Sequence, residues 1–124
     1  MTRFFSCLTL ALLSACVGGS KSDPATAVYF DDATVTCDPT ASVWDDLFLF
    51  EAWTGNDAVS VEVEVKDGGS SLGTLPLAED ESGYWYTEAW GDDLDADCDT
   101  FYGLRFLFSA RGADGSEASA EAAG

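Results

Sequence analysis

The sequence contains no histidine, and only five of its 124 residues are lysine or arginine. Without histidine the chain lacks the side chain most often used as a general base or metal ligand. So few basic residues leave no patch that could neutralise phosphates, which excludes nucleic acid as a partner. The chain also lacks a G-x-S-x-G sequence, a P-loop and a dinucleotide-binding motif. With 23 acidic residues, pairs of carboxylates occur by chance. We therefore predict that the protein is not an enzyme.

A long apolar run is also missing, because about 20 apolar residues are needed to cross a bilayer. The first residues carry one positive charge, Arg3, followed by about ten mostly apolar residues at 4–13. Gly18 and Gly19 come soon after this run. This order is typical of an export signal and not of a membrane-spanning helix. We therefore expect residues 1–15 to be a signal peptide that takes no part in the fold.

The end of this run, Leu13-Ser14-Ala15-Cys16, resembles the lipobox of bacterial lipoproteins. The resemblance implies that the signal is cut before Cys16 and that the Cys16 thiol carries lipid, with palmitate-type acyl chains. Two or three such chains anchor firmly, since each buried methylene contributes about 0.8 kcal/mol. It also implies a place in the cell envelope, with the outer membrane or cell surface favoured because Val17, and not aspartate, follows the cysteine. The alternative is an ordinary secretory signal cut near Ala15, which leaves Cys16 unmodified.

The chain that follows the signal is strongly acidic and rich in aromatic residues. Its four basic and 23 acidic residues leave a formal charge of −19, which favours solubility and opposes binding to anionic lipid headgroups. Four tryptophans, four tyrosines and six phenylalanines exclude a disordered chain. Residues 16–27 are small and polar and predict the lipidated cysteine with a flexible tether. Residues 28–124 suit one folded domain.

Apolar residues in this domain recur with period two, which is typical of β-strands. The clearest strands are predicted at residues 58–66 and 101–111. Their core-facing sets are predicted to be Val59, Val61, Val63 and Val65 in the first, and Tyr102, Leu104, Phe106, Phe108 and Ala110 in the second. Further strands are predicted at residues 33–37, 47–53, 72–78, 84–90 and 117–120, with turn sequences between them. The near-continuous apolar run at 47–53 predicts a buried strand.

Seven short strands in about 90 residues predict an all-β domain of the sandwich type. The sequences TVTCDP, VSVEVEV, SGYWY and FSARGADGSEAS, in this order, also resemble bacterial immunoglobulin-like and fibronectin type III-like domains. The resemblance covers most of residues 30–121. It implies a single seven-stranded immunoglobulin-like antiparallel β-sandwich. One departure is that Cys37 lies in the first predicted strand and Cys98 just before the sixth, whereas the antibody pattern uses the second and sixth strands.

Cys37 and Cys98 are the two cysteines that remain once Cys7 leaves with the signal and Cys16 carries lipid. Two cysteines in an oxidising compartment predict a disulfide. In the sandwich order, the first strand ends at the pole where the sixth begins. The two Cα atoms could therefore approach within about 7 Å, as a disulfide needs. A metal or redox pair is the weaker alternative, because there is no C-x-x-C sequence.

An acidic stretch at residues 92–99 is the candidate metal site, and its candidate ligands are Asp93, Asp95, Asp97 and Asp99. Alternating carboxylates resemble calcium loops, which supply six to eight oxygens. The EF-hand pattern is absent, because glycine and glutamate are missing at its sixth and twelfth positions. Calcium in another geometry, aided by Asp45 or Asp46, is an alternative to a solvated acidic loop. We expect no cofactor, with calcium as the alternative.

The alternation over residues 84–90 places Tyr84, Tyr86 and Trp90 on one face and Trp85 on the other. If Trp85 is in the core, three aromatic side chains face outward, as on a carbohydrate-binding surface. The alternative is that these rings are covered or merely pad an exposed sheet. We thus predict a membrane-anchored lipoprotein with a non-catalytic binding or structural domain. The alternatives are a calcium-stabilised adhesion domain and a carbohydrate-binding module. Expected partners are the membrane, through the lipid, and an envelope protein or a glycan.

Overall fold

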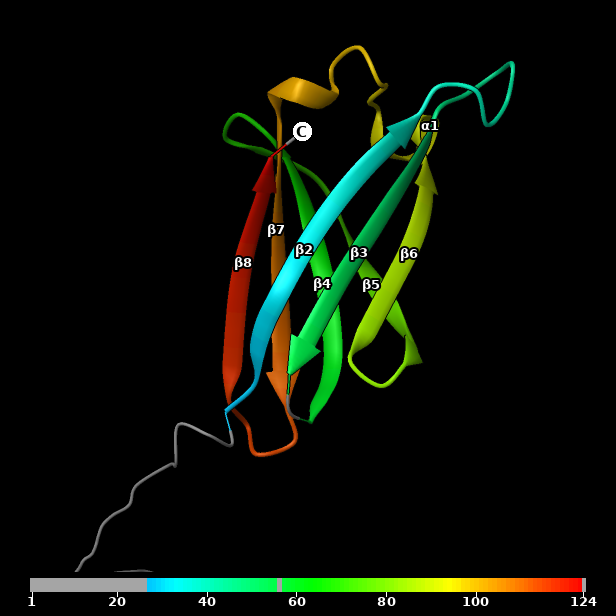
Figure 1. Cartoon of the computed structure of the whole chain (residues 1–124). Coiled ribbons are helices and arrows are strands. Elements are labelled where there is room, and N and C mark those ends of the chain that lie inside the picture. Colours follow the sequence, from blue (N-terminus) through cyan, green and yellow to red (C-terminus); the bar gives the residue numbers. More distant parts are fainter. Residues whose placement is uncertain (1–26, 56, 124) are drawn as a thin grey trace, which may run out of the picture.

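The computed structural model describes residues 27–55 and 57–123, which form a β-structure (Figure 1). Its seven strands are β2 (Tyr29–Asp38), β3 (Leu47–Gly55), β4 (Ala58–Asp67), β5 (Ser70–Glu81), β6 (Tyr84–Trp90), β7 (Leu104–Gly112) and β8 (Glu117–Ala123). A short helix, α1 (Gly91–Leu94), and a 3-10 turn (Phe101–Gly103) lie between β6 and β7. The predicted all-β class, with seven antiparallel strands, is confirmed.

The seven strands form one sheet in the order β2-β3-β6-β5-β4-β7-β8, in which all neighbours are antiparallel. Strand β5 pairs with β4 over most of its length and with β6 near its end. It therefore joins two halves: the aromatic half (β2, β3 and β6) and the arginine half (β4, β7 and β8). The edge strands β2 and β8 lie side by side, so the sheet is nearly barrel-shaped (Figure 1). The finer prediction of an immunoglobulin-like sandwich stays a prediction.

The core lies between the two halves and consists of their inward-facing side chains. Its largest fully buried side chains are Phe48, Phe50, Phe106, Phe108, Val63 and Val65. Rings from opposite halves meet edge to face, with centroids 5.9 Å apart for Phe50 and Phe106 and 6.4 Å apart for Phe30 and Phe108. Such aromatic pairs add about 0.5–1.5 kcal/mol to the stabilisation from buried area. The period-two pattern of the sequence thus places Val63, Val65, Phe106 and Phe108 correctly.

Two residues that were predicted to face the core do not. Val59 is 57% exposed, because the β4–β7 register shifts between Ala58 and Ser60. The extra residue of such a bulge breaks the alternation and turns its side chain outward. Tyr102 is 80% exposed, because residues 101–103 form a 3-10 turn and β7 begins only at Leu104. The predictions for Val59 and Tyr102 are therefore wrong.

The predicted disulfide is confirmed: Cys37 and Cys98 are bonded, with Cα atoms 5.6 Å apart. The bond joins the end of β2 to the segment that leads into β7, and so links the two halves at one pole. The described chain enters at the opposite pole, where β2 begins and β3 ends (Figure 1). The predicted signal peptide, Cys16 and nearly all of the predicted tether lie outside the described residues.

Candidate functional site

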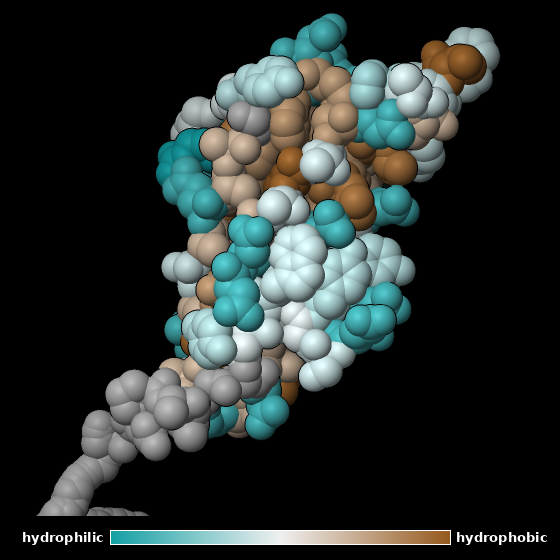
Figure 2. Space-filling view, viewed as in Figure 1, coloured by the Kyte–Doolittle hydropathy of each residue, from teal (hydrophilic) through white to brown (hydrophobic). Residues whose placement is uncertain are grey.

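Three aromatic side chains form a row on the outer face of the aromatic half. Trp53 on β3 and Tyr84 on β6 are cross-strand partners with ring centroids 5.4 Å apart. Tyr84 and Tyr86 follow with centroids 6.0 Å apart and ring planes inclined by 11°. Figure 2 shows pale, ring-shaped side chains gathered in the middle of this face, between hydrophilic ones. We call Trp53, Tyr84 and Tyr86 the aromatic row.

The structure confirms the alternation that was predicted for β6. Trp85 is buried in the core, whereas Tyr86 and Trp90 are 39% and 40% exposed and Tyr84 is half-buried. Trp90 lies at the disulfide end of the strand, opposite Leu47. Of the three predicted ligand-binding residues, the structure therefore brings Tyr84 and Tyr86 together. Trp90 makes no ring contact with them in the described part of the chain.

Glu51 links the aromatic row to β3, the strand on which Glu51 lies. Its neighbour across the ladder is Tyr86, and its Oε2 accepts a hydrogen bond from the Tyr84 hydroxyl at 2.6 Å. The phenol donates this bond only while it is protonated. The bond to Glu51, with burial and the negative charge nearby, raises the pKa of Tyr84 to about 12. The Tyr84 ring is thus held in place, and the second carboxylate oxygen of Glu51 keeps its acceptor capacity.

A buried hydrogen bond between β6 and β3 lies on the core side of the aromatic row. The Trp85 Nε1–H donates to Thr54 Oγ1 at 3.0 Å, and Thr54 is the buried polar residue of the described chain. The Thr54 N–H in turn donates to the Gly83 carbonyl at 2.7 Å. Gly83 has φ +85°, and a Cβ there would lie 2.7 Å from the Thr54 carbonyl oxygen. Only glycine fits this turn, which packs the β5–β6 connection against the end of β3.

A hollow of about 430 Å³ opens beside Trp53 and Tyr84. Three carboxylate residues line it: Asp31, Glu51 and Glu81. Asp31 reaches it from a bulge in β2, since the register skips from Phe30 to Asp32. A bulge commonly redirects a side chain in this way. We call this hollow, with its two rings and three carboxylates, the Trp53 pocket.

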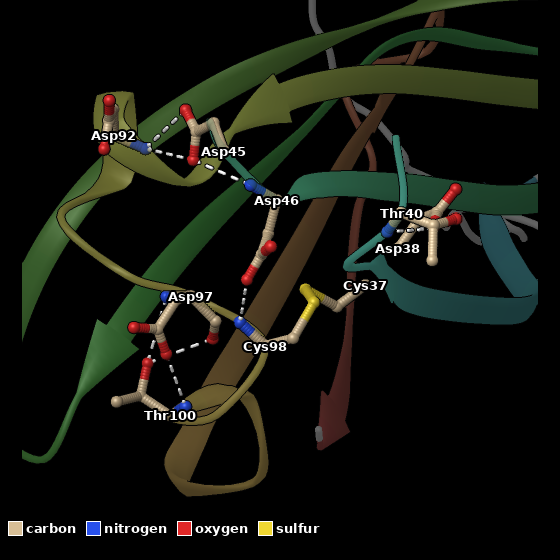
Figure 3. The surroundings of a disulfide bond; sticks show 9 residues. All are labelled: Cys37, Asp38, Thr40, Asp45, Asp46, Asp92, Asp97, Cys98 and Thr100. Atoms are coloured by element: carbon tan, nitrogen blue, oxygen red, sulfur yellow. Dashed lines mark hydrogen bonds between the residues drawn. A yellow bond between two sulfur atoms is a disulfide. The ribbon is translucent and has the colours of Figure 1, made fainter. Parts of the chain in front are cut away.

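The acidic pole around the disulfide has a different construction (Figure 3). The Asp45 carboxylate accepts from the N–H of Asp46 at 2.8 Å and from the N–H of Asp92 at 3.1 Å. The Asp46 carboxylate accepts from the N–H of Cys98 at 2.8 Å. The Asp97 carboxylate accepts from the N–H of Thr100 at 2.9 Å. These carboxylates hold loop backbone in place, which is a structural task.

The four predicted calcium ligands are exposed and do not converge. Among the described residues, the group of potential ligands within 4.8 Å of one another is Cys37, Asp46 and Cys98. Both sulfurs of that group are in the disulfide, so it offers no thiolate. The remaining calcium candidates are placed as follows: Asp93 in α1, Asp95 at its left-handed end, Asp97 capping the next turn and Asp99 beside the disulfide. Calcium binding stays a prediction.

Sequence reasoning missed Trp53 and the carboxylates of the Trp53 pocket. Residues 47–53 were predicted as a buried strand, yet β3 alternates, with Phe48, Phe50 and Ala52 inward and Trp53 half-buried on the outer side. The period-two rule, applied to β3 as it was to β6, would have placed Trp53 outward. The pairing of Trp53 with Tyr84 depends on the strand register, which one sequence does not reveal.

No known protein-family model matches this chain, and no curated protein or solved structure is significantly similar to it.

Proposed function

We propose that this protein is a lipid-anchored, non-catalytic module of the bacterial cell envelope that binds a saccharide with its aromatic row. The observation that carries the proposal is the outward stack of Trp53, Tyr84 and Tyr86 on a rigid sheet. The apolar faces of sugar rings pack on such aromatic faces. Sugar hydroxyls donate hydrogen bonds to carboxylates, and Glu51 keeps an oxygen available beside the row. A few polar groups among aromatic ones are typical of small-ligand sites.

The strand order supports the proposal of an immunoglobulin-like sandwich. The first, second and fifth strands pack together in the aromatic half, and the third, sixth and seventh in the arginine half. The two inner faces share one core of alternating side chains. In this arrangement β5 is the strand that passes from one layer to the other.

The lipid anchor is proposed from the lipobox at Leu13 to Cys16. None of the helices in residues 27–55 and 57–123 is long and apolar enough to span a membrane. Growth of cells with a clickable fatty acid should label the wild-type protein and not the Cys16→Ala variant. Cys7→Ala is the matched control and should keep the label. Equal labelling of the Cys16→Ala variant would refute the anchor.

A glycan array with the detergent-solubilised full chain tests saccharide binding. We expect hits that the Trp53→Ala and Tyr86→Ala variants lose. Trp44→Ala and Tyr102→Ala are the matched controls, because these two side chains are 88% and 80% exposed but lie outside the row. An array without hits, or equal losses in the control variants, would contradict the proposed function.

A further inference from the structure

The Trp53 pocket is a built feature of the aromatic half and not a gap between mobile side chains. Its floor carries the Trp85–Thr54 hydrogen bond, and one wall is the Gly83 turn, which is itself bonded to Thr54 at 2.7 Å. A second wall is Tyr84, whose hydroxyl is bonded to Glu51 at 2.6 Å. A ligand therefore meets groups that are already in place, which lowers the ordering cost of binding.

The charges around this pocket are all of one sign. Asp31, Glu51 and Glu81 line it. The basic residues of the described chain, Lys66, Arg105 and Arg111, all lie on β4 and β7, in the other half. Both arginines are paired with glutamates of β8, in contacts of 2.7 and 3.3 Å. No basic side chain of residues 27–55 or 57–123 therefore reaches the pocket to balance its carboxylates.

Charge complementarity selects the occupant of such a face. The faces of Trp53 and Tyr84 attract a cation through the ring quadrupole, and this attraction adds to that of the carboxylates. An ammonium group offers three N–H donors, which suit several carboxylate acceptors in charge-assisted hydrogen bonds. An N-acetyl group in the same place is neutral and offers one N–H. Surfaces lined by one sign of charge also raise the local concentration of an oppositely charged ligand.

We propose that the Trp53 pocket takes the protonated amine of an amino sugar, so that saccharides with free amines bind in preference to their N-acetylated counterparts. The inference rests on the proposed function, since the sugar ring itself stacks on the aromatic row. The pocket supplies the discrimination: the carboxylates that line it attract the ammonium group, and the Trp53 ring lies beside them.

The experiment is calorimetric titration of the detergent-solubilised full chain with two ligands of equal length, glucosamine oligomers and N-acetylglucosamine oligomers, below the pKa of the amine. We expect the glucosamine series to bind about tenfold tighter or more. The preference should shrink at about 1 M salt, where the Debye length is about 3 Å. Glu81→Gln should reduce the preference while the neutral series binds as before, and Glu51→Gln should weaken the glucosamine series more than the neutral series. Glutamine at position 51 can still accept the Tyr84 hydrogen bond.

Glu62→Gln and Glu117→Gln are the matched controls, because they remove the same charge from the arginine half. Equal binding of the two series would overturn the inference and leave the proposed function standing. An equal loss of preference in the control variants would also overturn it, because the effect would then come from net charge and not from the pocket. If no saccharide of either series or of the array binds, both proposals fail. Circular dichroism of each variant confirms that it is folded.

Discussion

The two halves of this molecule share one core but differ on their outer faces. The arginine half carries Arg105 and Arg111, which are paired with Glu121 and Glu117 on β8. The aromatic half carries rings and carboxylates without a basic residue in its described strands. The inner faces follow the same period-two pattern in both halves, because both must bury the same core. The outer faces are free of that constraint, so their difference points to function.

The comparison also separates two uses of acidic residues. In the arginine half, the pKa of Glu121 is held below its usual value by the hydrogen bond from Arg105. Exposed pairs of this kind contribute little to stability. In the aromatic half, Glu51 accepts a bond from an aromatic hydroxyl and positions a ring. The Glu121 carboxylate thus forms an exposed ion pair, whereas the Glu51 carboxylate positions the Tyr84 ring.

Removal of the disulfide should have the largest effect, because it is a covalent cross-link between the halves in addition to the main chain. The Cys37→Ser/Cys98→Ser double variant removes a cross-link between two residues that are 61 positions apart in the sequence. In the chain-entropy model we expect the free energy of unfolding to fall by about 4 kcal/mol. Urea titration followed by tryptophan fluorescence measures it. Wild-type protein in reductant should behave like the variant. An unchanged midpoint in both would show that the core alone holds the halves together.

The next largest loss of stability is expected from a glycine-to-alanine substitution, and one such substitution beside each half can be compared. Gly83→Ala places a Cβ 2.7 Å from the Thr54 carbonyl oxygen at φ +85°, and we expect a loss of about 3 kcal/mol. Gly68→Ala, at φ +61° with nothing within 4 Å, is the matched change beside the arginine half and should cost about 1 kcal/mol. Chemical denaturation measures both. Equal losses would mean that the turn next to the pocket is not packed as described.

Thr54→Val should destabilise the protein by about 1–3 kcal/mol, because it leaves the buried Trp85 Nε1–H without an acceptor. Thr36→Val, on the exposed side of β2, is the control and should stay within about 0.5 kcal/mol of the wild type. The same denaturation assay applies. A near-neutral Thr54→Val would show that the indole finds another partner and that the pocket floor is adaptable.

The smallest effect is the titration of Tyr84. Its folded pKa of about 12 lies above the ordinary tyrosine value of 10.0, so folding favours the protonated phenol. The stabilisation is therefore fully present below pH 10 and is lost as the pH rises through about 12. Tyrosinate absorbance should show one late-titrating group. Tyr84→Phe and Glu51→Ala should both remove it, whereas Tyr102→Phe should leave it. A late group that survives Tyr84→Phe would assign the shift to another tyrosine.

Much of this architecture could be predicted from the sequence. Alternation placed Val61, Val63 and Val65 inward because a buried face permits no other register. The pairing of Cys37 with Cys98 was predicted because these two cysteines remain after the signal and the lipidated cysteine are set aside, and it is confirmed. The prediction for Val59 was wrong because the bulge at this position depends on the pairing of β4 with β7. A bulge has no local sequence signal here.

The Trp53 pocket was less accessible to prediction. It brings together a bulged residue of β2, the end of β3 and the turn before β6, which are distant in sequence. Tyr84 and Tyr86 were predicted as ligand-binding residues because they alternate on one strand. Trp53 was not predicted, because it lies on a different strand. By contrast, the aspartates at residues 92–99 are close together in the sequence, so they could be identified from it as a candidate metal site. The structure assigns Asp97 there to a loop hydrogen bond.

The register of β2 has a mechanical consequence. The strand pairs with β3 from Tyr29 opposite Gly55 to Asp38 opposite Leu47. A pull on the chain ahead of residue 27, with a ligand held on β3 and β6, runs along this ladder and loads its hydrogen bonds together in shear. Cys37, at the far end of this extended strand, is bonded to Cys98. The force therefore passes along β2 into the disulfide, and the strand cannot slide out of the sheet while that bond is intact.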